Sequence, residues 1–179
     1  MSGRGRLILD LCGGTGSWSR PYAEAGYDVR LVTLPVHDVR TYRLPPYEVW
    51  GVLASPPCTE FSHALNRHAA YRERDLAAGM ETVNACMRII LQANPRWWAL
   101  ENPLGHLSTI LGPPRFRFNP SDFGDPWTKR TCLWGAFAIP RKTPLAQRQL
   151  TDVTQLHRNP HRRAMTPPGF AKAFFAANP

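Results

Sequence analysis

Residues 7–16 of this chain read LILDLCGGTG, an apolar run that passes directly into a glycine-rich turn. The run at residues 7–11 predicts a buried strand, and the pattern of residues 17–25, ended by Gly26, predicts a helix after the turn. A strand, a tight turn and a helix in this order indicate a parallel sheet covered by helices.

The rest of the chain continues this rhythm. Further strands are predicted at residues 27–33, 49–54, 96–100 and 131–137, and helices at residues 72–93 and 168–177. We therefore predict an α/β fold with a mostly parallel sheet flanked by helices, in a single domain over residues 1–179. Within it we expect a catalytic core at about 5–135, a reduced, basic and proline-rich part at about 113–165, and a terminal helix at about 167–178.

The composition indicates a globular protein with a polyanionic partner. The chain has 179 residues, of which 43% are hydrophobic, and its formal net charge is +9. The basic excess is concentrated between Arg115 and Arg163, where ten Lys or Arg side chains face three acids. No apolar run approaches the roughly 18 residues of a membrane span, and the first residues lack the apolar region of a signal peptide. We therefore expect a cytoplasmic protein with no membrane partner.

The cysteines do not form a metal-binding pattern. Cys12, Cys58, Cys86 and Cys132 contain no C-x-x-C pair and fit no zinc spacing, so no metal is expected. In the cytoplasm they are expected to be reduced. Cys86 fits the apolar face of a helix, whereas Cys58 follows no such pattern and requires a separate explanation.

The glycine turn predicts a cofactor site. Glycines after a strand allow the backbone to approach a ligand closely, and the following helix offers free N–H groups. The spacing does not fit G-x-G-x-x-G, and no acid ends the second strand, so a dinucleotide is disfavoured. S-adenosylmethionine, which has no pyrophosphate, fits the shorter turn, and Asp38 is placed to accept a hydrogen bond from its adenine; a turn-capping aspartate is the alternative. The expected cofactor-binding residues are Asp10, Cys12, Gly13, Gly14, Thr15, Gly16, Trp18, Asp38 and Pro56.

A second polar motif, residues 55–62 (SPPCTEFS), follows the buried strand at residues 49–54. Its two prolines stiffen the backbone, so Cys58 stands on a rigid mount, as a nucleophile requires. A thiolate is a strong nucleophile once its pKa is lowered. Carbon 5 of cytosine has no lone pair, but thiolate addition at carbon 6 makes carbon 5 nucleophilic. Amino methyltransferases tend to carry an aromatic residue at the position of Cys58, so carbon methylation is favoured.

A third motif, residues 99–103 (ALENP), follows the next predicted strand. There Glu101 could protonate nitrogen 3 of the ring as the thiolate adds, which neutralises the developing charge. A helix-capping role is the alternative for Glu101 alone; together with the cysteine turn, the catalytic interpretation is favoured.

Together these motifs resemble the DNA cytosine-5 methyltransferases, and among them small phage-type members without a separate target-recognition domain. The resemblance covers the glycine turn, the cysteine turn and the Glu101-Asn102 pair, in the order of the family. More loosely, residues 123–130 resemble its later basic motif and residues 166–171 its C-terminal motif. The resemblance implies a Rossmann-like class I methyltransferase fold that serves DNA modification, as in restriction–modification or phage DNA protection.

The resemblance also implies individual roles. Cys58 would be the nucleophile, Glu101 the proton donor, and Lys129 or Arg130 would stabilise the ring oxygen of a cytosine flipped out of the duplex. The segment at residues 63–75 would close over the target. The residues expected to contact substrate or DNA are Pro57, Ser62, Asn102, Arg67, Arg72, Arg162 and Arg163.

The chain departs from the family in several places. Cys12 stands where the family has an aromatic residue that packs on adenine, and we assign part of that role to Trp18. The acid after the second strand is missing, and the family's Glu-Asn-Val is Glu-Asn-Pro here. About 35 residues separate the basic motif from the C-terminal motif. We therefore expect that the target site is short, that the specificity is relaxed, or that a separate partner supplies it.

Two alternatives remain open. The same chemistry could act on a cytosine nucleotide or RNA, or use a carboxylated adenosylmethionine. A non-catalytic nucleic-acid-binding relic of the fold is the other alternative, against which the intact pair of Cys58 and Glu101 argues.

Overall fold

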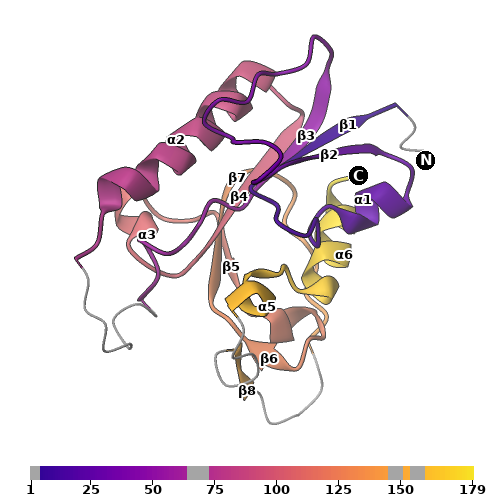
Figure 1. Ribbon diagram of the computed structural model, residues 1–179. Helices are drawn as coiled ribbons and strands as arrows, with labels where there is room; N and C mark the ends of the chain where they lie inside the picture. The colour runs from indigo at the N-terminus through magenta and orange to yellow at the C-terminus, as the bar shows by residue number, and fades with distance from the viewer. Residues whose placement is uncertain (1–4, 64–72, 145–150, 154–159) are drawn as a thin grey trace.

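A computed structural model describes residues 5–63, 73–144, 151–153 and 160–179. A six-stranded sheet forms its centre, in the order β2-β1-β3-β4-β7-β5 (Figure 1). The strands are β1 (Leu7–Leu11), β2 (Asp28–Val32), β3 (Val49–Ala54), β4 (Trp97–Pro103), β5 (Phe116–Phe118) and β7 (Thr131–Ala136). The strands β2, β1, β3 and β4 run parallel, while β7 is antiparallel to both β4 and β5. The carboxyl ends of β1, β3 and β4 therefore share one edge.

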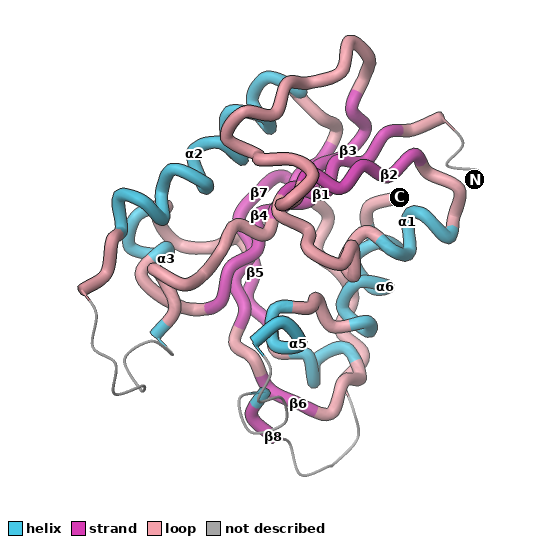
Figure 2. The backbone as a smooth tube through the Cα atoms, in the orientation of Figure 1, coloured by secondary structure: helices cyan, strands magenta, loops and turns pink. Residues whose placement is uncertain are grey.

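Helices cover both faces of the sheet, as Figure 2 shows. On one face lies α2 (Leu76–Ala93), and on the other lie α1 (Arg20–Glu24) and α6 (Pro168–Ala177). The alternation along β1 explains these two layers, because successive side chains of a strand point to opposite faces. Leu7, Leu9 and Leu11 join the core under α2, while Ile8 joins the aromatic core under α1 and α6. Both faces of β1 are buried, which accounts for its continuous apolar sequence.

The boundaries of α2 follow from its capping residues. Asp75 accepts a hydrogen bond from the backbone N–H of Ala78 (2.8 Å), so the helix begins at Leu76 rather than at residue 72 as predicted. Asn94 ends it in the left-handed conformation, with φ of 43°. The predicted helix at 17–25 is shorter too: α1 spans only Arg20–Glu24, because the Ser19 side chain bonds to the preceding turn.

The predicted strand at residues 96–100 is too short. In the structure β4 continues to Pro103, because β7 pairs with it as far as the register Pro103–Thr131. Glu101 and Asn102 therefore lie within β4 and not after it, which corrects the sequence-based placement. A strand pairing between distant segments leaves no local signal.

The part after β4 contains short elements that the sequence pattern did not reveal. They are α3 (Leu107–Ile110), β5, the 3₁₀ helix η2 (Pro120–Phe123), β6 (Trp127–Thr128), β8 (Thr151–Asp152) and α5 (Pro160–Ala164). Strands β6 and β8 pair in parallel as a small second sheet. Among the described residues, no helix is both long and apolar enough to cross a bilayer.

Candidate active site

The cysteine turn after β3 is fastened to both neighbouring strands. The Ser55 N–H donates to the Leu11 carbonyl at the end of β1 (2.9 Å). On the other side, Asn102 Nδ2 of β4 donates to the Pro56 carbonyl (2.9 Å). Asn102 is fully buried under the turn, and its predicted contact with substrate stays a prediction. It positions the segment that carries Cys58.

The end of the turn is fixed as well. The N–H groups of Phe61 and Ser62 donate to the Cys58 carbonyl (3.0 and 2.8 Å), and the Phe61 ring is fully buried. Gly105 lies against this backbone so closely that a Cβ there would clash with the Phe61 carbonyl. Hydrogen bonds on both sides and a buried anchor hold Cys58 in one place.

Three charged side chains surround the Cys58 thiol, which is itself half-buried. Burial raises the pKa of Cys58 most strongly, and the nearby Glu101 carboxylate raises it further, while Lys129 and Arg163 oppose the rise. Lys129 Nζ lies 3.6 Å from Glu101 Oε1, and both side chains are about 15% exposed. The resting cysteine is therefore a thiol in the field of a shielded ion pair.

Of the two cations predicted for this position, the structure brings Lys129 to Glu101. Arg130 is exposed, and its backbone carbonyl accepts a hydrogen bond from the Leu104 N–H (2.9 Å).

The glycine turn after β1 surrounds a buried carboxylate. Asp10 is 0% exposed; its Oδ2 accepts a 2.6 Å hydrogen bond from Ser19 Oγ, while its Oδ1 has no partner among the residues that the structure describes. Burial raises the pKa of Asp10 to about 6. A Cβ at Gly13 would clash with this carboxylate. Gly13 thus lets the backbone of the turn pack directly against the Asp10 carboxylate.

Most of the remaining predicted cofactor residues belong to the glycine turn itself, and Trp18 lies apart from them. Cys12, with φ of 58°, is half-buried. A hydrogen bond with Cys86 lowers its pKa, while burial and the charges of Asp10 and Asp38 oppose the decrease. Asp38 also accepts hydrogen bonds from the backbone and side chain of Arg40, as the turn-capping alternative requires. Gly14 and Thr15 are exposed and Gly16 is buried, all in the same turn.

Trp18 lies elsewhere. It is 1% exposed, and its ring packs against Phe170 (5.8 Å between centroids) and Phe174 (5.3 Å) of α6. The predicted contact with adenine is therefore not supported, because the ring is enclosed in the core between α1 and α6. The spacing of Trp18 from the glycines gave no indication of this long-range packing.

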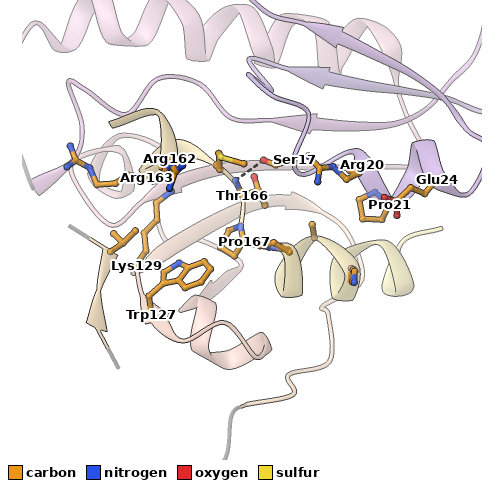
Figure 3. A pocket seen from close by; sticks show the side chains of 15 residues that line it. Ser17, Arg20, Pro21, Glu24, Trp127, Lys129, Arg162, Arg163, Thr166 and Pro167 are labelled. Carbon is orange, nitrogen blue, oxygen red and sulfur yellow. Dashed lines mark hydrogen bonds between the residues drawn. The ribbon is translucent and has the colours of Figure 1, made fainter. Parts of the chain in front are cut away.

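Next to the ion pair lies a cavity of about 630 Å³ (Figure 3). The cavity is lined by Ser17, Arg20, Pro21, Glu24, Trp127, Lys129, Val153, Arg162, Arg163, Met165, Thr166, Pro167, Pro168, Ala171 and Lys172. A hydrogen bond from the Thr166 N–H to Ser17 Oγ (2.9 Å) joins the glycine-turn region to the start of α6 across its middle. The predicted Arg162 and Arg163 line it, whereas Arg20, Trp127 and Lys172 were missed.

Other predicted residues lie at the cysteine turn or outside the described structure. Pro57 is exposed and Ser62 half-buried, both within the turn. Arg67 and Arg72 fall in residues 64–72, outside the described residues. No group of three potential metal ligands occurs in the described part of the chain.

The α/β fold of the chain is shared with solved structures of other proteins. A structure described as a putative DNA modification methyltransferase encoded within an E. coli prophage aligns with a TM-score of 0.53 and 17% identity, over 74% of this chain and 47% of its own. This likeness confirms the predicted fold class. A DNMT2 mutant from Spodoptera frugiperda aligns with a TM-score of 0.47 and 19% identity, over 83% of this chain and 54% of its own. The chain thus spans about half the length of these structures. No family model and no curated protein sequence matches the chain.

Proposed function

We propose that this chain is an S-adenosylmethionine-dependent methyltransferase that modifies carbon 5 of a cytosine in DNA through Cys58. One observation carries the proposal: three strand-end segments bring Cys58 into the field of Glu101 and Lys129, which form a shielded ion pair. A nucleophile, a proton carrier and a cation at one edge of the sheet match the needs of addition to an electron-poor ring.

The resting protonation states suggest how the site starts the reaction. Cys58 is a thiol and Glu101 a carboxylate, so one proton must move from sulfur, by way of Glu101, to nitrogen 3 of the ring. Sulfur then bonds to carbon 6, and the ring becomes nucleophilic at carbon 5. Lys129 stabilises the carboxylate before the transfer and the ring oxygen after it. After methyl transfer, the carbon 5 proton is lost to solvent, the bond between carbon 6 and sulfur breaks, and the proton on nitrogen 3 returns by way of Glu101 to sulfur. These steps restore the Cys58 thiol and the Glu101 carboxylate.

The residues present fit the cofactor. Adenosylmethionine supplies an electrophilic methyl group and carries both a sulfonium and an ammonium charge. Asp10 Oδ1, which has no partner among the described residues and belongs to a carboxylate packed against the glycine turn, suits a cationic amine. Asp38 and the backbone of residues 12–16 would hold the rest, with Pro56 facing them from the cysteine turn.

A nucleic-acid substrate is supported by charge. The net charge of +9 favours a polyanion, and the cations of the cavity lie beside the ion pair at Glu101. A base in a duplex must be flipped out to reach such a site. The same chemistry on a free cytosine nucleotide is the second candidate, because few residues separate the basic motif from the C-terminal motif.

A covalent trap tests the proposal. The protein is incubated with adenosylmethionine and an oligonucleotide containing 5-fluorocytosine, and a denaturing gel reports the adduct. Carbon 5 of this base carries fluorine in place of the proton that must be lost, so the covalent intermediate persists. We expect an adduct that disappears in Cys58→Ser and persists in Thr59→Ala, a variant of the exposed neighbour in the same turn. If cytidine monophosphate is methylated and no DNA adduct forms, the substrate is the nucleotide and not DNA. If neither reaction occurs, the proposal is wrong.

A further inference from the structure

The cavity beside the ion pair has a strongly basic lining. Five cationic side chains line it against a single acid, Glu24. The cations are Arg20, Lys129, Arg162, Arg163 and Lys172. Trp127, Lys129 and the two arginines of α5 lie at one end, and Arg20 and Glu24 lie at the other (Figure 3). Such a lining selects an anion.

The remaining lining is apolar. Trp127 is half-buried, and Val153, Met165 and prolines at the start of α6 continue the apolar surface. An aromatic ring amid cations is the combination with which proteins hold single-stranded nucleic acid, because the base stacks and the phosphate is paired. The volume of about 630 Å³ lies in the range of pockets that take small organic ligands.

The position of the cavity limits what it can hold. Lys129 belongs both to the cavity and to the ion pair with Glu101, and the charge of Arg163 reaches the Cys58 thiol. A ligand here therefore lies beside the reacting base. Adenosylmethionine is a poor candidate, because its net charge is positive and five cations would repel it.

We infer that this cavity binds the nucleotide adjacent to the target cytosine, with its base on Trp127 and its phosphate on Arg162 and Arg163. The inference rests on the proposed function, since it takes the target to be part of a polynucleotide. It assigns a role to Trp127, and it gives the chain a means of holding the strand beside the target. Stacking tolerates any base, so the preference at this position is weak.

A double-mutant cycle in binding tests the stacking contact. The ligand is a labelled single-stranded oligonucleotide with one cytosine, compared with versions in which the nucleotide on the 5′ or the 3′ side is abasic, and anisotropy reports affinity. We expect Trp127→Ala and one of the abasic changes each to weaken binding about 5- to 100-fold, and the two together hardly more than either alone. Trp127→Phe should restore most of the affinity. Additive losses would overturn the inference.

Charge variants test the phosphate contact. Arg162→Gln with Arg163→Gln should weaken oligonucleotide binding and reduce its salt dependence, whereas the matched variant Arg141→Gln, exposed and outside the cavity, should change little. Cytidine monophosphate should bind far more weakly than the oligonucleotide and should not respond to Trp127→Ala. If it responds equally, or if these variants weaken adenosylmethionine binding in calorimetry instead, the inference is wrong.

These measurements separate the inference from the proposed function. They record binding by intact, folded protein, verified by thermal unfolding, and require no methyl transfer. Coupling between Trp127 and one abasic position without any covalent adduct would contradict the proposed function and support nucleotide binding in the cavity. An adduct without coupling would support the proposed function and contradict nucleotide binding in the cavity.

Discussion

The two turns at the centre of the site are held in opposite ways. The cysteine turn after β3 is bonded to β1 through Ser55 and to β4 through Asn102, so its backbone leaves Cys58 little freedom. The glycine turn after β1 closes around a carboxylate of which one oxygen has no partner in the described part of the chain. A nucleophile benefits from fixed geometry, whereas a binding site needs a group that stays unsatisfied until its ligand arrives. A substitution in one turn should therefore leave the other turn intact.

The largest effect is expected at Glu101. Glu101→Gln keeps the shape of the side chain but cannot relay a proton to the ring, so we expect kcat to fall about 10²- to 10⁴-fold. DNA affinity should change little, which a filter or anisotropy assay can measure. A loss confined to affinity would show that Glu101 binds and does not transfer a proton.

A change at Asp10 should weaken cofactor binding and leave the cysteine turn intact. Asp10→Asn removes the charge that faces the cofactor amine, and we expect calorimetry to show about 10- to 100-fold weaker adenosylmethionine binding. In the wild type, affinity should also fall as pH drops below 6, where Asp10 gains a proton, and the variant should lack this dependence. Unchanged trapping of 5-fluorocytosine at saturating cofactor would confirm that the cysteine turn is intact.

The same variant should change stability in the opposite sense. The pKa of Asp10 in the folded chain, about 6, exceeds its ordinary value of 3.8, so burial favours the protonated form. Its contribution to stability is full below pH 4 and is lost as pH rises through 6. At pH 8, Asp10→Asn should be more stable than the wild type by up to about 3 kcal/mol, and near pH 4 the two should be equal. Urea unfolding at both pH values tests this; a gain that does not depend on pH would contradict it.

A change at Asn102 should loosen the cysteine turn. Asn102→Ala leaves the Pro56 carbonyl without its buried donor, and we expect a loss of about 1–3 kcal/mol in the free energy of unfolding. At temperatures well below the unfolding transition, the rate of adduct formation should be lower than in the wild type. The affinity for adenosylmethionine should stay unchanged. An unchanged rate would mean that the other bonds suffice to hold Cys58.

The smallest effect is expected at Lys129. Lys129→Met removes a charge that lowers the pKa of Cys58, so the pH at which iodoacetamide alkylates Cys58 should rise. Arg141→Gln, which lies away from the site, is the control. A shift to lower pH would show that Lys129 acts mainly on Glu101.

The sequence allowed the order of the elements around both turns to be predicted, because their signals are local. Apolar runs mark the buried strands, glycine and proline mark the turns, and parallel strands bring their ends to one edge. The boundaries were less predictable. The extension of β4 through Glu101 and Asn102 depends on its pairing with β7, some 30 residues away in the sequence.

By itself, the sequence determined that a cysteine turn and a glycine turn follow two strands of one sheet, and that an acid lies near the end of a third. Only the tertiary structure decided that Lys129 pairs with Glu101, that Asn102 supports the turn from below, and that Trp18 belongs to the core. It also joined Arg20, Trp127 and Lys172, which are far apart in the sequence, in one cavity. The physical reason is that a local pattern records which face of an element is apolar, whereas the neighbours of a polar side chain depend on how distant elements pack.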